Sequence, residues 1–561
     1  MTTFDWLIVI LVNGAIVGYG LVISRGTKTA ADWFLAARGL PWWIVGLSMF
    51  ATAVDSGDYV AVVGGAYTFG LSNLTTWWLG MPIGWFIVSY GVFLPLYRSG
   101  MFTNSEYLEY RFGPSVRVLS ALIQIQNRTN VLGNIAFSLY LMFSILTGWG
   151  SETWWLVVAI AAAAAAYTAS GGLKSVAITD ALQSVMMFIA ALVLWLTVWN
   201  VVGGWSGLEA RFEAIDPALA DSMMHVGGRR EAGVPPALVI FGWIVTLTSY
   251  CVVNHSQAMR MLASRSEWDM KMAAAVASVV TAFVMWFNIT LGVVGRAIYP
   301  EIESVDRVFP LLVQDYLAPG LVGVVVGGVL AGGISTYDSI GSSVAAVFTR
   351  DIYARFIVRN GDDTHYLKVS RWATPAIIAL SFGYVPFLQS GMIAFYLRLA
   401  AVAVIPLFAV TMMGALTRVH RGSGVVGLVV GMLYGLSSLL GEMLGWPLPV
   451  WWTNTWWAYL WSVLLCSGTM VTFSLVRGWA TEEEVRGLVF RGDVGADGAY
   501  RVTRLAASEG TWLESTREQL EDMPKYPFAI GPGGLLWYQR PALWAGVFLL
   551  PTGTICLWVL W

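Results

Sequence analysis

The stretch SMFATAVDSGDYVAVVGGAY, residues 48–67, decides how the rest of this chain can be interpreted. It lies inside an apolar run long enough to cross a bilayer, where a carboxylate costs about 2.5–3.5 kcal/mol on insertion scales. Yet Asp55 and Asp58 stand in its middle, on either side of Ser56 and Gly57. Ser and Gly favour helices weakly, and non-helical backbone survives at membrane depth only where protein buries it or it borders a cavity. The stretch therefore predicts a broken membrane helix whose free carbonyls and carboxylates face a cation or a polar solute.

The composition of the whole chain indicates a membrane protein. Of its 561 residues, 57% are hydrophobic and 12% are charged, against roughly 25% charged residues in soluble domains. The formal net charge of -2 gives no reason to expect a nucleic-acid partner. All three cysteines lie in apolar runs, so neither a disulfide framework nor a zinc site is predicted. We expect an all-α polytopic protein of the plasma (inner) membrane, surrounded by the lipid bilayer and without an obligate protein partner.

Runs of about 18 or more apolar residues predict fourteen membrane helices. The first has no basic residue before it and no small-residue cleavage site after it, so it is interpreted as a span and not as a signal peptide. The predicted helices cover residues 4–24, 42–68, 73–97, 118–147, 152–168, 176–202, 237–256, 272–298, 318–349, 371–390, 392–417, 424–444, 455–477 and 541–560.

Positive charge predicts the orientation of these helices. With Arg296, Arg371 and Arg477 at helix ends counted in the adjoining connections, the odd-numbered connections carry 25 of the 32 Lys and Arg residues, the even-numbered connections carry 5, and 2 lie well inside helices. Because cytoplasmic loops collect Lys and Arg, both termini are expected to be extracellular or periplasmic. The charged stretch 478–540 has too few apolar residues for a core and is expected to be a cytoplasmic loop. Paired tryptophans such as Trp77-Trp78 are interpreted as interfacial belts rather than as ligand-stacking groups.

A second polar interruption falls at the end of the helix over 237–256, where Asn254 and His255 precede Arg260. This helix follows the first interrupted one by five positions. Because five is odd, two five-helix repeats would be inverted relative to one another, as in many secondary transporters. His255 has no second His or Cys at ligand spacing, so no metal other than sodium is expected there. The predicted division is 1–41 (first helix and cytoplasmic loop), 42–202 (first repeat), 203–417 (second repeat, with an extracellular loop over 203–236), 418–477 (two helices), 478–540 (cytoplasmic loop) and 541–561 (last helix).

The predicted helix over 318–349 combines a glycine-rich half with a cluster of oxygen-bearing side chains. It contains GLVGVVVGGVLAGGISTYDSIGSS, residues 320–343, whose glycine spacings allow another backbone to approach closely. Hydroxyls and a carboxylate follow at once, and such oxygens are hard ligands suited to a hard cation. A Ser-Thr pair usually bonds back to its own helix, but Asp338 at membrane depth makes that simpler interpretation insufficient.

The predicted helix over 118–147 carries one polar stripe that cannot face lipid. Its members are Gln124, Asn127, Arg128, Asn134 and Ser138. Arg128 has two interpretations, which the residues leave open. Its fork of donors could bind a carboxylate on a solute, or it could form an internal ion pair with Asp55 or Asp58.

Three segments of the chain resemble the sodium:solute symporter family, which includes sodium/glucose, sodium/proline, pantothenate and sialic acid symporters. They are SMFATAVDSGD with the following GGAY, YTASGGLKSVAITDALQSVMM over 167–187, and LAGGISTYDS over 330–339 with the following FTRDIY. With the matching helix count, the likeness spans residues 1 to about 480. It implies the inverted-repeat fold first recognised in the leucine transporter, with a transported solute and co-transported sodium.

The resemblance also implies a sodium site between the broken helix and the glycine-rich helix. Two carbonyls at the break, one further carbonyl and two hydroxyls carry over onto Thr52, Asp55, Gly332, Ser335 and Thr336. Members with a second sodium hold it with an aspartate and oxygens one turn further on. Those positions correspond here to Asp180, Ser335, Asp338 and Ser339. Whether this chain uses one sodium or two stays open.

The substrate pocket follows the family less closely. Where the family's sugar transporters have a glutamate and a glutamine, this chain has Leu79 and Tyr59, which weakens a sugar assignment. Arg128 falls near an arginine that faces the substrate carboxylate in the sialic acid transporter, and Asn254 falls near a substrate-contacting asparagine. The candidate substrate-binding residues are Ser56, Asp58, Tyr59, Arg128 and Asn254.

These features predict a sodium-coupled symporter that imports a small polar organic solute, with a carboxylate as one option, by alternating access. The alternatives left open are a sugar or polyol symporter, proton coupling through Asp55, Asp58 and His255, and a transporter-like sensor. No nucleophile with a base, no cofactor motif and no catalytic metal set is present in the sequence, so an enzyme is not expected.

Overall fold

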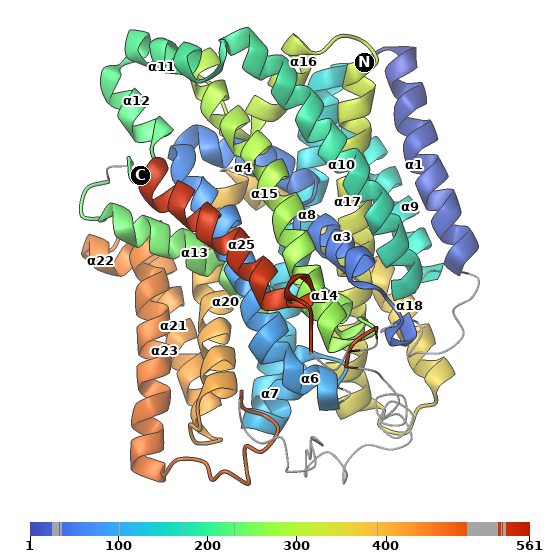
Figure 1. Cartoon of the computed structure of the whole chain (residues 1–561), viewed down its shortest axis with the longest axis vertical. Coiled ribbons are helices and arrows are strands. Elements are labelled where there is room, and N and C mark those ends of the chain that lie inside the picture. The colour runs from blue at the N-terminus through green and yellow to red at the C-terminus, as the bar shows by residue number, and fades with distance from the viewer. Residues whose placement is uncertain are drawn as a thin grey trace.

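The computed structural model describes residues 1–24, 33, 36–99, 101–170, 172–228, 231–389, 391–490, 525–528, 530 and 534–561. Within these ranges the regular structure is helical, and the two β-bridges are isolated. The long helices run roughly alongside one another as a bundle, with shorter helices crossing its ends (Figure 1). The protein is therefore an all-α membrane protein, as its composition predicts.

Twelve of the described helices are long and apolar enough to cross a membrane. They are α1 (Thr3–Ser24), the run from η3 to α6 (Thr76–Arg98), α8 (Pro114–Thr147), α9 (Thr153–Ser170), α10 (Leu173–Val202), α13 (Pro236–Val253), α15 (Glu267–Ile298), α17 (Leu321–Val347), α20 (Met392–Leu416), α21 (Ser423–Met443), α23 (Thr455–Arg477) and α25 (Pro541–Thr554), which the π-helical turn η11 (Ile555–Val559) extends to a span of 19 residues.

Two of the fourteen predicted spans do not qualify, each for a physical reason. The span predicted at 42–68 is divided into α3 (Trp42–Ala53) and α4 (Ser56–Phe69), and neither half reaches 18 residues. The span predicted at 371–390 begins earlier, as α18 (Asp363–Ser381), so its first turns are polar. The chain then continues through a 3₁₀ turn into α19 (Val385–Leu388).

Several short helices were missed because they are too short or too polar for a count of apolar runs. The predicted loop over 203–236 contains α11 (Gly204–Ile215) and α12 (Pro217–Met224). Asp216 starts α12 by accepting a hydrogen bond from Ala218 N–H at 2.9 Å, with proline at the first helical position. Also present are α7 (Asn104–Phe112), α14 (His255–Leu262), α16 (Val308–Tyr316) and α22 (Val450–Thr453). Most of the loop predicted over 478–540 lies outside the described residues.

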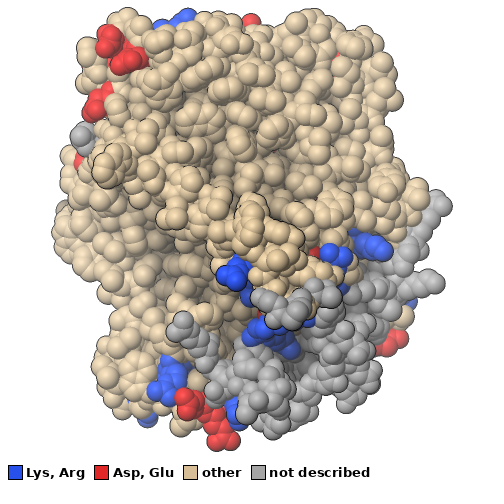
Figure 2. Space-filling view, viewed as in Figure 1, with Lys and Arg blue, Asp and Glu red and all other residues tan. Residues whose placement is uncertain are grey.

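Both termini lie toward the same end of the bundle. The amino group of Met1 donates to the carbonyl of Leu146 at the end of α8, at 2.9 Å. The carbonyl of Leu560 accepts from Val226 N–H just beyond α12, at 2.6 Å. In the face shown by Figure 2, most Lys and Arg side chains lie in the opposite half of the molecule. This arrangement fits the predicted topology, and the side of the membrane that each end faces stays a prediction.

Glycines let α17 lie unusually close to its neighbours. A Cβ atom built on Gly328 would be 2.5 Å from Ala190 Cβ and 2.6 Å from the carbonyl oxygen of Met186, both on α10. A Cβ atom on Gly323 would be 2.7 Å from the Cα atom of Asp5 on α1. The close backbone approach predicted from the glycine spacing is confirmed, and it holds α17 at the centre of the fold.

Gly328→Ala is expected to lower the thermal unfolding temperature of the purified protein. The added methyl would clash with the α10 backbone, and such overpacking costs about 1–3 kcal/mol. The adjacent Gly327→Ala is the matched control, because its Cβ atom would meet nothing nearer than 3.8 Å. Replacing glycine by alanine at that second position should raise stability slightly. Equal unfolding temperatures for the two variants would contradict this packing.

Candidate functional site

The break in the first polar helix is built by its own two acids. Val54 and Asp55 have extended backbone between α3 and α4. Asp55 Oδ1 accepts hydrogen bonds from the N–H groups of Gly57 and Asp58, at 2.6 and 3.2 Å. Asp58 Oδ2 accepts from Asp55 N–H at 3.0 Å, which completes a capping box. The predicted break is confirmed, and helix capping accounts for one oxygen of each carboxylate.

A second break follows the same plan. α13 ends at Val253 and α14 begins at His255, with extended backbone at Asn254 between them. Asn254 Oδ1 accepts from Ser256 N–H at 2.9 Å. The polar interruption predicted near this position is therefore present. His255 is buried, and its backbone N–H donates to Gln124 Oε1 at 3.0 Å. Among the described residues, no cluster of three or more His, Cys, Asp or Glu is suited to hold a metal ion.

Oxygen atoms from the first break and from α17 meet in the core. The hydroxyls of Ser335 and Thr336 lie 3.1 and 3.3 Å from the carbonyl oxygen of Ala51. A Cβ atom on Gly332 would be 3.5 Å from the Cα atom of Asp55, so the two elements touch here. The carbonyl of Thr52 instead accepts from the Tyr250 hydroxyl at 3.3 Å. The two hydroxyls thus meet the carbonyl of Ala51 near the end of α3, and Gly332 contacts Asp55, while the assignment of the five positions to a sodium ion stays a prediction.

A dense ionic network lies next to this cluster, on the side away from the termini. Asp180 accepts from Ser335 Oγ and Ser48 Oγ, both at 2.6 Å, and from Arg260 Nη2 at 2.9 Å. Arg260 Nε also donates to Ser48 Oγ at 2.8 Å, and Arg260 Nη2 donates to Ser339. All five side chains are buried, with at most 1% of their surface exposed. The network joins α3, α10, α14 and α17.

Three of the four residues predicted to hold a second sodium, Asp180, Ser335 and Ser339, lie in this same network. Two of them, Asp180 and Ser339, are hydrogen-bonded to the Arg260 guanidinium. Asp338 is 1% exposed, and its Oδ1 has no hydrogen-bond partner in the described part of the chain. In this structure the guanidinium supplies the positive charge at these oxygens, so a second sodium would have to displace it.

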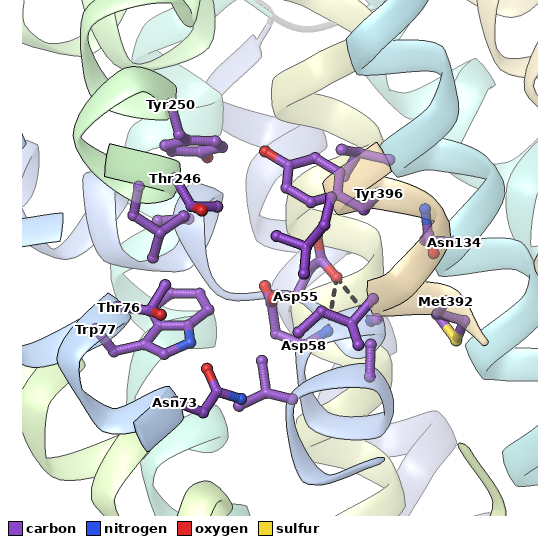
Figure 3. A pocket seen from close by; sticks show the side chains of 18 of the residues that line it. Asp55, Asp58, Asn73, Thr76, Trp77, Asn134, Thr246, Tyr250, Met392 and Tyr396 are labelled. Carbon is purple, nitrogen blue, oxygen red and sulfur yellow. Dashed lines mark hydrogen bonds between the residues drawn. The ribbon is translucent and has the colours of Figure 1, made fainter. Parts of the chain in front are cut away.

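A cavity of about 100 Å³ borders the first break. Its walls come from α4, α8, α13, α20, η2 (Gly70–Asn73) and the π-helical turn η3 (Thr76–Gly80). Figure 3 shows Thr76, Trp77 and Thr246 across the gap from Asp55 and Asp58. The space is large enough for several waters or a small solute.

Of the five predicted substrate residues, Asp58 lines this cavity and the other four do not. Ser56 Oγ accepts from Ser138 Oγ at 2.9 Å, behind the cavity wall. The Tyr59 hydroxyl donates to the carbonyl of Met187 at 2.6 Å. Asn254 caps α14. The helical turn explains the difference, because Ser56 and Tyr59 lie on the face of α4 away from Asp58.

Arg128 contacts a neighbouring amide and an aromatic ring in this structure. Its guanidinium lies 4.7 Å from the centre of the Tyr250 ring, and Nη2 donates to Asn127 Oδ1 at 2.5 Å. It forms no ion pair with Asp55 or Asp58 in the described structure. Tyr250 lines the cavity, whereas Arg128 is not among its lining residues.

Sequence reasoning missed most of the cavity wall. Trp77 is 4% exposed and lines the cavity, so its interpretation as an interfacial residue was wrong. Its neighbour Trp78 is only partly buried and donates through Nε1 to the carbonyl of Ala282 at 2.9 Å. The other lining residues that the sequence analysis did not select include Asn73, Thr76, Trp243, Thr246, Tyr250 and Tyr396. An apolar and aromatic run offers no local signal that separates a cavity wall from a packed core.

Comparison with known proteins connects this geometry to a family. The model of the sodium:solute symporter family matches residues 33–431. Sodium/glucose cotransporter 4 of Danio rerio is 27% identical over 471 residues, which cover 76% of this chain and 70% of the relative. Sodium/glucose cotransporter 4 of Homo sapiens is 28% identical over 473 residues, covering 76% of this chain and 67% of the relative.

Solved structures share the fold. The substrate-bound outward-open state of a sodium-coupled sialic acid symporter superimposes with a TM-score of 0.72 at 19% identity, covering 86% of this chain and 99% of that one. A nucleobase–cation symport-1 family transporter in a closed conformation gives a TM-score of 0.52 at 12% identity, covering 82% and 99%. The fold is that of the leucine transporter, and the protein is a transporter, not an enzyme. Because the family model covers well over half of its length, this chain belongs to the sodium:solute symporter family and is a sodium-coupled solute symporter.

Proposed function

We propose that the protein imports a small polar organic solute together with sodium, by alternating between outward-open and inward-open states. The observation that carries this proposal is the meeting of the α17 hydroxyls of Ser335 and Thr336 with the carbonyl of Ala51, close to the first break. Hydroxyl and carbonyl oxygens are the ligands that a hard cation such as sodium prefers. In the proposed topology both termini are extracellular or periplasmic, the protein lies in the plasma (inner) membrane, and the repeats cover 42–202 and 203–417.

The proposed sodium site consists of carbonyls from Thr52, Asp55 and Gly332 and hydroxyls from Ser335 and Thr336. The carbonyl of Ala51 joins this set, because both hydroxyls lie within 3.3 Å of it. Bound sodium would tie the broken helix to α17. A ligand shifts a conformational equilibrium only by its differential affinity for the two states, so these oxygens must be better arranged in the outward-open state.

Sodium entry supplies the driving force in this proposal. Moving one elementary charge inward through the membrane potential is worth about 2.3 kcal/mol per 100 mV. The solute would occupy the cavity lined by Asp58, next to the sodium site, and complete the pocket before the bundle moves. A carboxylate on the solute was expected because of Arg128. Since Arg128 does not line the cavity, the proposal keeps only the wider class of small polar organic molecules.

Uptake by purified protein in liposomes tests this function. Solutes are offered with an inward sodium gradient at equal pH on both sides, and separately with an inward proton gradient without sodium. We expect accumulation with the sodium gradient alone. Accumulation driven by the proton gradient would favour coupling through Asp55, Asp58 and His255. The sensor alternative predicts that the cell responds to the solute through the charged loop. That alternative is favoured if deleting residues 491–524 abolishes this response to the solute while uptake persists.

A further inference from the structure

The solute cavity carries negative charge and no positive charge on its described walls. Asp55 and Asp58 line it, and no Lys, Arg or His does. One oxygen of each carboxylate is used by the capping box. Asp58 is half-buried, and its Oδ1 accepts no hydrogen bond from any described residue. A carboxylate oxygen therefore remains available on the cavity side.

Buried polar groups at the cavity wall lack partners as well. Asn73 is 0% exposed, and neither its Nδ2 nor its Oδ1 forms a hydrogen bond within the described structure. Thr76 is 3% exposed, and its Oγ1 also has no partner there. Both residues line the cavity, and Figure 3 shows them beside the gap that Asp58 faces. Buried polar groups in folded proteins are almost always hydrogen-bonded, so these atoms indicate a polar ligand.

Aromatic rings complete the wall. Trp77, Trp243, Tyr250 and Tyr396 all line the cavity. Figure 3 shows the two tyrosines at one end of the gap and Trp77 at its side. The faces of aromatic rings attract cations, and Trp attracts them most strongly. Tyr250 already stacks on the Arg128 guanidinium at 4.7 Å. Rings and a carboxylate around one small space form a site suited to a substituted ammonium ion.

The charge balance of the surrounding core points the same way. Four carboxylates are opposed by two guanidinium groups among the described residues around the break. The carboxylates belong to Asp55, Asp58, Asp180 and Asp338, and the guanidinium groups to Arg128 and Arg260. Charges in a poorly solvated interior need compensation. An excess of carboxylates over guanidinium groups favours cations, such as sodium and a cationic solute, over anions at this place.

From these observations we infer that the transported solute is a small organic cation, a substituted ammonium ion held between Asp58 and the aromatic rings of the cavity. Its polar substituent meets Asn73 and Thr76. The inference rests on the proposed function, because it names the solute of the same symport cycle. An anionic solute would face the carboxylates of Asp55 and Asp58 with no Lys, Arg or His on the described cavity wall, and a neutral sugar would leave the aromatic rings without a cation.

Binding of a matched pair of probes tests the charge of the solute. Choline carries a quaternary ammonium group. Its neutral analogue 3,3-dimethylbutan-1-ol has the same shape, with a carbon atom in place of the charged nitrogen. In sodium buffer we expect choline or ethanolamine to raise the unfolding temperature of the purified protein, and the neutral analogue to bind at least tenfold more weakly. Equal or stronger binding of the neutral analogue, glucose or N-acetylneuraminate would overturn the inference, and so would no binding of either ammonium compound.

Variants of the cavity separate a binding role from a structural one. Asp58→Asn keeps an oxygen that can accept from Asp55 N–H but removes the charge, and should weaken choline binding at least tenfold. Trp77→Leu should weaken it severalfold, whereas Trp78→Leu, the same change outside the cavity, should not. Unchanged choline affinity in both Asp58→Asn and Trp77→Leu would contradict the inference. If one of the two variants fails to fold, unchanged affinity in the folded one would contradict it.

The ratio of charge to solute distinguishes failure of this inference from failure of the proposed function. Radioactive sodium uptake, solute uptake and membrane current are measured on the same liposomes. After the sodium charge is subtracted, one positive charge should remain for each solute molecule. No remaining charge, or a negative one, would overturn the inference while leaving sodium symport intact. Solute uptake that is independent of sodium would instead overturn the proposed function.

Discussion

Arg260→Leu is expected to lower the stability of the purified protein by about 3–5 kcal/mol, because it leaves the charge of Asp180 buried without its partner. Arg260 is 0% exposed and joins Asp180, Ser48 and Ser339. Loss of these contacts should also abolish uptake. Thermal unfolding followed by tryptophan fluorescence measures the change in stability, and liposome uptake measures the change in activity.

The control for this prediction is an arginine whose ion pair is exposed. Arg307 pairs with Glu303, and the two side chains are 38% and 81% exposed. Exposed pairs contribute about 0–1 kcal/mol, so Arg307→Leu should have little effect. Adding Asp180→Asn to Arg260→Leu removes the uncompensated charge and should recover part of the lost stability. An unfolding temperature unchanged by Arg260→Leu would contradict the role of the network.

The second large effect is expected at the sodium site. Thr336→Ala should raise the sodium concentration needed for half-maximal uptake at least tenfold, because it removes one of the few oxygens around the ion. The Thr336 hydroxyl contacts only the carbonyl of Ala51 among the described residues, so little else is lost. Ser335→Ala should do the same, but it also removes a hydrogen bond to Asp180 and therefore perturbs the ionic network.

Ser342→Ala is the matched control on the same helix. The Ser342 hydroxyl donates back to the carbonyl of Ser339 at 3.2 Å and contacts neither break. Its loss should leave the sodium dependence of uptake unchanged. Thr336→Ala and Ser342→Ala with the same sodium dependence would refute the assignment of the sodium ligands.

The features that could be predicted from the sequence are those with a local cause. Two acids around Ser56 and Gly57 in an apolar run oppose a continuous helix, and the chain breaks there. Glycines at helical spacing remove side chains from one face of α17, and α10 packs against that face. Long apolar runs predict membrane helices, and twelve of the fourteen predicted correspond to helices that qualify as spans.

The features that the sequence did not reveal depend on distant contacts. Arg260 and Asp180 are 80 residues apart, and nothing in either segment indicates the other. The cavity wall joins Asn73, Trp77 and Tyr396, whose positions follow only from the packing of η2, η3 and α20. The polar stripe on α8 faces the core, as predicted. The stripe does not reveal which group Arg128 contacts, because that depends on the position of Tyr250 on α13.

The central claim is that oxygens from the first break and from α17 hold the transported sodium. Equilibrium binding of radioactive sodium to the purified protein, compared with the Ser335→Ala/Thr336→Ala double variant, tests it most directly. We expect saturable binding to the unmodified protein and loss of that binding in the double variant while both remain folded. Saturable binding of equal affinity in a folded double variant would contradict the claim.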